Sequence, residues 1–90
     1  MFYVVSYDIP DDKKRDRIAR TLLDFGIRVQ YSVFECIMDE DGVKRLTARL
    51  SELVSDEDSV RLYALCAKCE SAALVLGTGK TAKDENVYIL

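Results

Sequence analysis

The sequence predicts a small α+β fold, a β-sheet covered by helices, and three observations support this. The chain has 90 residues, enough for a single domain with a small core. Several short segments alternate apolar and polar residues with a period of two, as half-buried strands do. Between them lie two stretches whose apolar residues recur at helical spacing. We therefore expect one domain over residues 1–90 that mixes strands and helices.

The N-terminal part predicts a strand followed by a helix. Phe2 to Tyr7 is rich in β-branched and aromatic residues and stops at Asp8-Ile9-Pro10, where proline disfavours helix at the residue before it. Asp11-Asp12 can cap a helix that runs to about Phe25, and Gly26 ends it. The inward stripe of this helix is Ile18, Leu22 and Phe25.

The next segment, Ile27 to Met38, decides the topology. It alternates throughout, and we interpret it as one long strand with a bulge or bend partway. Two strands joined near Gln30-Tyr31 are the alternative. That alternative gives the order β-α-β-β-α-β of the ferredoxin-like sandwich. With a single strand here, the segment Ala72 to Leu76 would have to supply the missing place in the sheet.

The remaining elements complete the sandwich. A second helix is expected to begin near Asp41-Gly42, and Ser59 to Leu65 alternates as a strand. Two short apolar segments, Ala72 to Leu76 and Asn86 to Leu90, predict an appended C-terminal strand or hairpin. The last strand has no obvious partner in its own chain, so we expect it to pair with a second copy in a homodimer. The second helix has its apolar stripe at Val43, Leu46, Thr47, Leu50, Leu53 and Val54.

Composition narrows the class of protein. No apolar run approaches the length of a membrane span, and the first residues lack the basic start of a signal peptide, so we expect a cytoplasmic protein with no membrane partner. Three cysteines cannot all pair within one chain, and we expect reduced thiols. Cys66-Ala67-Lys68-Cys69 has the spacing of half a zinc site or a redox pair. We interpret these as buried or incidental thiols, with a dimer-bridging site as the alternative.

Charge is unevenly distributed along the chain. The net charge is -3, which argues against phosphate binding when taken alone. Residues 13–28, however, contain six cationic side chains and two anionic ones, whereas residues 35–58 contain eight anionic and three cationic ones. Arginine forks suit phosphate oxygens, and Arg17 and Arg28 are the strongest candidates. Solvated helix faces are the alternative reading. Lys13 and Lys14 oppose the helix dipole, so a ligand or an acidic neighbour could compensate them.

Asp8 is the strongest candidate for a catalytic or metal-binding residue. It lies where a strand meets a turn, a position that often holds a functional carboxylate on a rigid scaffold. The chain contains no histidine, which excludes imidazole acid-base catalysis. One carboxylate is a poor site for Mg²⁺, but two-fold symmetry could bring Asp8 together with its copy. The alternative is a structural role in which Asp8 only caps the following turn.

Several segments together match a pattern that covers nearly the whole chain. In this combination they resemble the small CRISPR-associated endoribonuclease family, the partner of the CRISPR integrase in spacer acquisition. The matching segments are Tyr7-Asp8-Ile9, the basic helix with Arg15 and Arg17, Val29-Gln30-Tyr31-Ser32-Val33-Phe34-Glu35, Ser59-Val60-Arg61-Leu62-Tyr63-Ala64-Leu65-Cys66 and Asn86-Val87-Tyr88-Ile89-Leu90.

The resemblance implies a ferredoxin-like homodimer in which the two Asp8 residues face each other and hold Mg²⁺ or Mn²⁺. It implies catalytic positions at Asp8 and Tyr7. It also implies nucleic-acid-binding positions at Arg15, Arg17, Arg28 and Phe34, with ordinary sheet packing as the alternative for Phe34.

Two classes of function follow from these residues. The first is a metal-dependent endonuclease that cleaves phosphodiesters of DNA or RNA. The second is a non-catalytic scaffold that bridges integrase subunits and contacts the DNA backbone. A toxin-like ribonuclease of related fold matches less of the sequence. The experiment that separates them is a nuclease assay on the wild type and Asp8→Asn.

Overall fold

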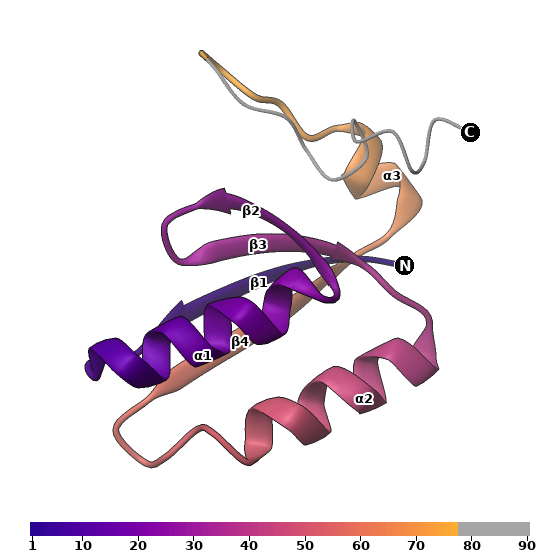
Figure 1. Ribbon diagram of the computed structural model, residues 1–90. Helices are drawn as coiled ribbons and strands as arrows, with labels where there is room; N and C mark the ends of the chain where they lie inside the picture. Colours follow the sequence, from indigo (N-terminus) through magenta and orange to yellow (C-terminus); the bar gives the residue numbers. More distant parts are fainter. Residues whose placement is uncertain (78–90) are drawn as a thin grey trace.

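The computed structural model, which describes residues 1–77, has the element order β1-α1-β2-β3-α2-β4-α3. The first six elements follow the β-α-β-β-α-β order, so the predicted ferredoxin-like α+β fold is confirmed. Figure 1 shows α1 and α2 on the same side of the sheet. The bounds are β1 Phe2–Asp8, α1 Asp12–Leu23, β2 Gly26–Gln30, β3 Val33–Ile37, α2 Glu40–Ser51, β4 Ser59–Leu65 and α3 Ala67–Ser71.

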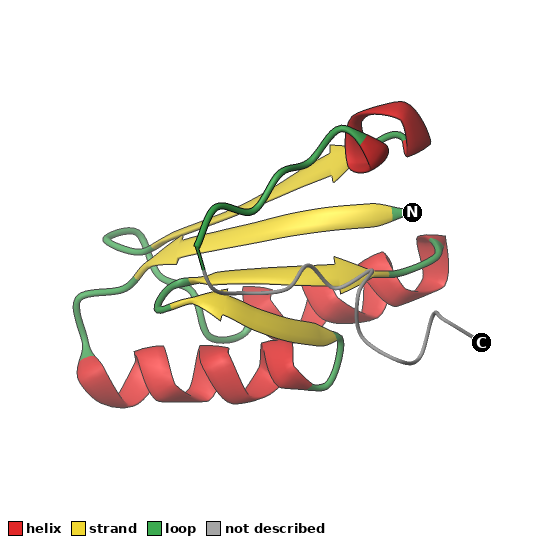
Figure 2. Ribbon diagram, turned by 90° about the horizontal axis from the view of Figure 1, so that it is seen from above, coloured by secondary structure: helices red, strands yellow, loops and turns green. Residues whose placement is uncertain are grey.

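The four strands form one sheet in the order β2-β3-β1-β4 (Figure 2). β1 pairs antiparallel with both β3 and β4, which places it inside the sheet rather than at an edge. Its side chains alternate between the two faces of the sheet, as a strand period of two requires. Val5 and Tyr7 point to the helix side and are buried, whereas Asp8 is exposed. The C-terminal end of β1 is therefore held from both sides.

The segment Ile27 to Met38 is two strands and not one. β2 and β3 form a hairpin with a turn at Tyr31-Ser32, and the pairing register shifts between Arg28 and Gln30. The interpretation as one long strand is wrong, and the alternative with a break near Gln30-Tyr31 is confirmed. The expected bulge is present, but it accompanies a turn.

Both long helices begin where an aspartate caps the first turn. The Asp11 carboxylate accepts the backbone N–H of Lys14 at 2.8 Å, and Asp39 accepts that of Gly42 at 2.8 Å. Ile18, Leu22, Leu46 and Leu50 then face the sheet. The described core consists of Val5, Tyr7, Ile9, Ile18, Ala19, Leu22, Phe34, Cys36, Met38, Leu46 and Leu50.

The C-terminal part differs from the prediction. Ala72 to Leu76 is not a strand; it follows the short helix α3, which the sequence analysis did not predict. Cys66 and Cys69 are exposed, so the interpretation as buried thiols is wrong for this pair. The strand expected at Asn86 to Leu90 lies outside the described residues. No helix within residues 1–77 has the length and apolarity needed to cross a bilayer.

Candidate functional site

Asp8 ends β1 on the face of the sheet that the helices leave open. Tyr7, one residue earlier, is 4% exposed and points into the core, and Ile9, one residue later, is also buried. The exposed carboxylate therefore sits between two anchored side chains. This local arrangement limits how far the backbone at Asp8 can shift.

On the open face, Asp8 lies beside polar residues of β4. The strand register pairs Asp8 with Ser59 and Ser6 with Arg61. Ser6, Asp8, Ser59 and Arg61 line a shallow hollow of about 260 Å³, together with Tyr63. The Arg61 guanidinium donates to the Tyr63 hydroxyl at 3.4 Å. Asp8 thus has hydroxyl groups and one guanidinium on this side.

A second hollow of about 430 Å³ also has Asp8 in its lining. Asp8 and Tyr7 are common to both hollows. The lining residues of this hollow are Tyr7, Asp8, Ile9, Pro10, Arg15, Tyr31 and Ser32.

Arg15 holds the loop that follows Asp8. Its Nε and Nη2 donate to the Ile9 carbonyl at 3.0 and 2.9 Å, and Nη2 also reaches the Pro10 carbonyl at 3.1 Å. Nη1 donates to Asp12 at 2.7 Å. Hydrogen bonding to the Asp12 carboxylate, then to the Tyr31 hydroxyl, raises the pKa of Arg15, which stays charged. Arg15 therefore fixes the Asp8 loop and also brings positive charge to the hollow.

Arg28 is joined to Tyr7 and the hairpin turn. Its Nη2 donates to the Tyr7 hydroxyl at 3.2 Å, and that hydroxyl donates to the Tyr31 carbonyl at 3.2 Å. The guanidinium carbon of Arg28 lies 5.8 Å from the centroid of the Tyr31 ring and 5.4 Å from that of Phe34. Tyr7 thus connects the strand that carries Asp8 to Arg28 and to the hairpin turn.

Phe34 lies under this cluster and not on the surface. Its side chain is 0% exposed, and its ring centroid is 6.3 Å from that of Tyr7. A base cannot stack on a ring with no free face. The structure therefore favours the sheet-packing alternative for Phe34, in which it supports Tyr7 and Arg28 from below.

Two cations of α1 lie apart from this cluster. Arg17 is exposed, and among the described residues its guanidinium has no hydrogen-bond or ion-pair partner. Lys14 instead forms an ion pair with Asp58, to which its ammonium donates at 2.7 Å. Asp58 is thus the acidic neighbour that compensates the charge of Lys14 at the start of α1. The Asp58 side chain is 1% exposed and accepts the N–H of Ser55 as well. This pair joins α1 to the loop before β4 and is structural.

The metal site expected at Asp8 is not completed by the side chains that the structure describes around it. Among the described residues, no group of three or more His, Cys, Asp or Glu side chains could hold a metal ion. Mg²⁺ prefers six oxygen ligands, usually with one or two carboxylates and several waters. Asp8, an exposed carboxylate with Ser6 and Ser59 beside it, supplies too few oxygen ligands for Mg²⁺ by itself.

Tyr31 and Arg61 are residues that the sequence analysis did not propose for the site. Tyr31 lines the hollow beside Asp8 and contacts Arg15 and Arg28. Arg61 reaches the site only through the strand register. The alternation of residues 60–65 already put Arg61 on the polar face, but only the pairing of β4 with β1 places it beside Asp8.

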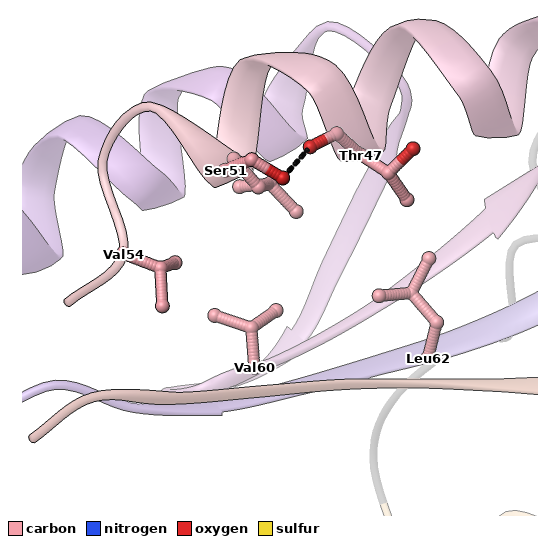
Figure 3. Close-up of a pocket in the computed structure, with 6 residues that line it drawn as sticks. Thr47, Ser51, Val54, Val60 and Leu62 are labelled. Carbon is pink, nitrogen blue, oxygen red and sulfur yellow. Dashed lines mark hydrogen bonds between the residues drawn. The ribbon is translucent and has the colours of Figure 1, made fainter. Parts of the chain in front are cut away.

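A third hollow is apolar and unsuited to phosphate chemistry. It lies between α2 and β4 and has a volume of about 360 Å³. Figure 3 shows Val54, Val60 and Leu62 pointing into it, with the hydroxyls of Thr47 and Ser51 on the helix side. Both hydroxyls donate to backbone carbonyls of α2. This hollow offers no charged group.

Comparison with known proteins decides the family. A sequence model described as CRISPR associated protein Cas2 matches residues 1–73. The chain belongs to the Cas2 family. CRISPR-associated endoribonuclease Cas2 1 of Chloroflexus aurantiacus is 39% identical over 93 residues, covering 100% of both chains. This confirms the resemblance inferred from the sequence.

Solved Cas2 structures share the fold. Streptococcus pyogenes Cas2 at pH 6.5 superposes with a TM-score of 0.75 at 30% identity, covering 86% of this chain and 100% of that one. A chain of a partial Cas6-RT-Cas1–Cas2 complex gives a TM-score of 0.75 at 26% identity, covering 83% of this chain and 89% of that one. The ferredoxin-like sandwich is thus common to this chain and its relatives.

Proposed function

We propose that this Cas2 chain acts in CRISPR spacer acquisition as a homodimeric, nucleic-acid-binding endonuclease that cleaves phosphodiesters with the help of Mg²⁺ or Mn²⁺. The observation that carries the proposal is the exposed Asp8 carboxylate at the end of the inner strand β1, where it lines two hollows that Arg15 and Arg61 also line. The name of the Chloroflexus relative, an endoribonuclease, supports the same chemistry. We further infer that residues 1–90 form one domain and work in the cytoplasm.

A homodimer is part of the proposal because one chain cannot complete the site. Each described chain supplies one Asp8, and a hard cation is better held by two carboxylates. The chain also exposes apolar side chains after α3, with Leu74 at 87% and Leu76 at 92% exposure. Apolar surface of this kind favours an interface. Sedimentation at micromolar concentration tests this, and a fully active monomer would exclude a shared site.

The residues around Asp8 divide the work of binding and cleavage. A metal held by the two Asp8 carboxylates would polarise a phosphate oxygen and lower the pKa of a bound water. Arg28 and Arg61 would neutralise phosphates of the bound strand on either side. Arg15 and Tyr7 would keep Asp8 in place through the contacts to the Ile9 carbonyl and to Arg28. Arg17, on the outer face of α1, would contact the nucleic-acid backbone further away.

A non-catalytic scaffold is the second candidate function, and a specific observation favours it. One of the solved structures comes from a complex that also contains Cas1, the integrase partner expected from sequence. A scaffold needs the dimer and the arginines but no metal at Asp8. Under this alternative the chain joins integrase subunits and binds DNA, and Asp8 only terminates β1.

Asp8→Asn separates the two candidates, because it keeps the side-chain shape and removes the charge that a hard cation needs. For the nuclease, we expect hydrolysis of RNA and DNA substrates to require Mg²⁺ or Mn²⁺ and to be lost in Asp8→Asn. The dimer and its capture by the integrase should be retained. Asp16→Asn, an exposed carboxylate on α1, is the matched control and should remain active.

A thermal melt gives a readout independent of activity. A bound cation stabilises the folded state by mass action, so Mg²⁺ should raise the Tm of the wild type and of Asp16→Asn but not that of Asp8→Asn. Equal Mg²⁺ responses in all three proteins would show that Asp8 is no metal ligand. Integrase binding with no hydrolysis in the wild type would favour the scaffold.

A further inference from the structure

The described chain contains a pair of thiols that the proposed nuclease chemistry does not use. Cys66 and Cys69 flank the first turn of α3, directly after the edge strand β4. Both are exposed, whereas Cys36, the third cysteine, is fully buried under the helices. The chain thus carries two accessible thiols three residues apart and one shielded thiol as an internal reference.

Cys66 and Cys69 stand at the N-cap and at the third residue of the first turn of α3. Cys66 is the N-cap of α3, and its carbonyl accepts the N–H of Glu70 at 2.9 Å. Cys69 is the third residue of the helix, and its carbonyl accepts the N–H of Ala72 at 3.2 Å. Residues three apart on a helical turn are neighbours.

The two thiols also differ from each other in acidity. The backbone N–H of Cys69, followed by its thiol and by the N–H of Lys68, lowers the pKa of Cys66. The hydrogen bond to Cys66 raises the pKa of Cys69. Burial raises the pKa of Cys36 to about 11. Because the thiolate is the nucleophile, this order makes Cys66 the attacking thiol, Cys69 the resolving one and Cys36 inert.

We propose that Cys66 and Cys69 form a redox-active dithiol site that exchanges reversibly with low-molecular-weight disulfides. The Cys66 thiolate attacks one sulfur of the disulfide, forms a mixed disulfide and releases one thiolate. Cys69 loses its proton to solvent, and its thiolate attacks the Cys66 sulfur and displaces the second thiolate. The net reaction oxidises two protein thiols to one disulfide and reduces one small disulfide to two thiols.

The thiol–disulfide exchange would change the covalent structure of α3, which links β4 to the segment that follows α3. In the described residues this segment exposes Leu74 and Leu76, the side chains that we place at the dimer interface. A disulfide across the first turn of α3 would restrict the backbone from which that segment departs. The site lies on α3, apart from Asp8, so its chemistry can be tested without touching the proposed nuclease residues.

The test uses the full-length dimer and glutathione disulfide as the probe. After incubation over a series of ratios of reduced to oxidised glutathione, free thiols are alkylated and the chain is analysed by mass spectrometry. We expect the wild type to lose two of its three alkylation sites without retaining glutathione, with a disulfide between Cys66 and Cys69 in the peptide map. Excess reduced glutathione should restore both sites. Cys36→Ser should behave in the same way.

The single variants identify the steps. Cys69→Ser lacks the resolving thiol and should accumulate one glutathione on Cys66, whereas Cys66→Ser should react more slowly. The pKa of about 11 at Cys36, two units above the ordinary 9.0, corresponds to roughly 100-fold less thiolate at pH 7. A thiolate of lower pKa is also less nucleophilic, so we expect Cys66 to be alkylated at least about 10-fold faster than the buried Cys36. Stable glutathione adducts on wild-type Cys66, or equal rates at all three cysteines, would overturn the proposal.

Discussion

Replacing Phe34 tests whether this ring packs or binds nucleic acid. The side chain is fully buried in β3, beside the Tyr7 ring and under Arg28. Truncation of a buried phenylalanine to alanine costs about 3–5 kcal/mol. Leucine keeps most of the apolar volume and loses mainly the aromatic contact, worth about 0.5–1.5 kcal/mol, and the cation–π contact, worth about 0.5–1 kcal/mol.

We therefore expect Phe34→Leu to lower the free energy of unfolding by about 1–2.5 kcal/mol and Phe34→Ala by about 3–5 kcal/mol. For a domain of this size each kcal/mol corresponds to roughly 4–8 °C in Tm. Urea and thermal unfolding measure both variants at one protein concentration, since dimerisation makes Tm depend on it. Nucleic-acid binding is then measured at a temperature at which Phe34→Leu remains folded.

The packing role predicts that folded Phe34→Leu binds nucleic acid within a few-fold of the wild type. Phe25→Leu is the matched control, because Phe25 is half-buried and also lies under arginines, Arg45 and Arg49, in another part of the fold. A Phe34→Leu protein with wild-type stability and abolished binding would refute the packing role and restore base stacking.

Three further predictions concern the fold and its charges. The Lys14 hydrogen bond lowers the pKa of Asp58, so its stabilisation should be present above the ordinary value of 3.8 and be lost as the pH falls through the folded pKa. Asp58→Asn should flatten the Tm profile between pH 2 and 5. Gly26→Ala should unfold the hairpin, because its Cβ would meet the backbone of β3, and circular dichroism would detect a much lower Tm. Arg17→Ala and Arg28→Ala should reduce the slope of log affinity against log salt by about 0.9 for each lost contact with a duplex phosphate, measured by fluorescence anisotropy.

The hairpin shows why one part of the fold escaped the sequence analysis. Its turn, Tyr31-Ser32, contains no glycine, proline or asparagine, the residues that usually mark a two-residue turn. Within residues 1–77, no residue other than glycine has a positive φ, so this turn uses backbone angles that any residue adopts. The alternation also continues across it. The sequence therefore contains no turn-forming residue at the point where the chain reverses direction.

The helices were predicted well because their signals are local. Asp11 and Asp39 cap α1 and α2 through their side chains, and the apolar stripes begin one turn later. α3 has five residues, fewer than two turns, so it has no periodicity to detect. Ala72 to Leu76 has the composition of a strand, but strand formation depends on pairing, and within residues 1–77 this segment pairs with no strand of the sheet.

The sequence analysis proposed site residues only in the first half of the chain. Tyr7 and Asp8 lie next to each other, and Arg15 follows within one helical turn of the cap. Arg61 is 53 positions beyond Asp8 and reaches the open face only because β4 pairs with β1 in one register. A shift of that register by one residue would turn Arg61 toward the helices. Arg61 therefore joins the site through long-range strand pairing, which no local sequence pattern encodes.

The alternation of β1 links the core to the chemistry. Tyr7 points into the core and Asp8 points to the open face. Because they are neighbours on one strand, the packing of Tyr7 also fixes the position of Asp8. The Tyr7 hydroxyl in turn accepts a hydrogen bond from the Arg28 guanidinium and donates one to the Tyr31 carbonyl. We therefore expect a change in the buried cluster of Phe34 and Tyr7 to shift the Asp8 carboxylate through β1. Core substitutions near Tyr7 should thus alter catalysis without touching the nucleic acid, whereas substitutions at Arg17 should alter binding alone.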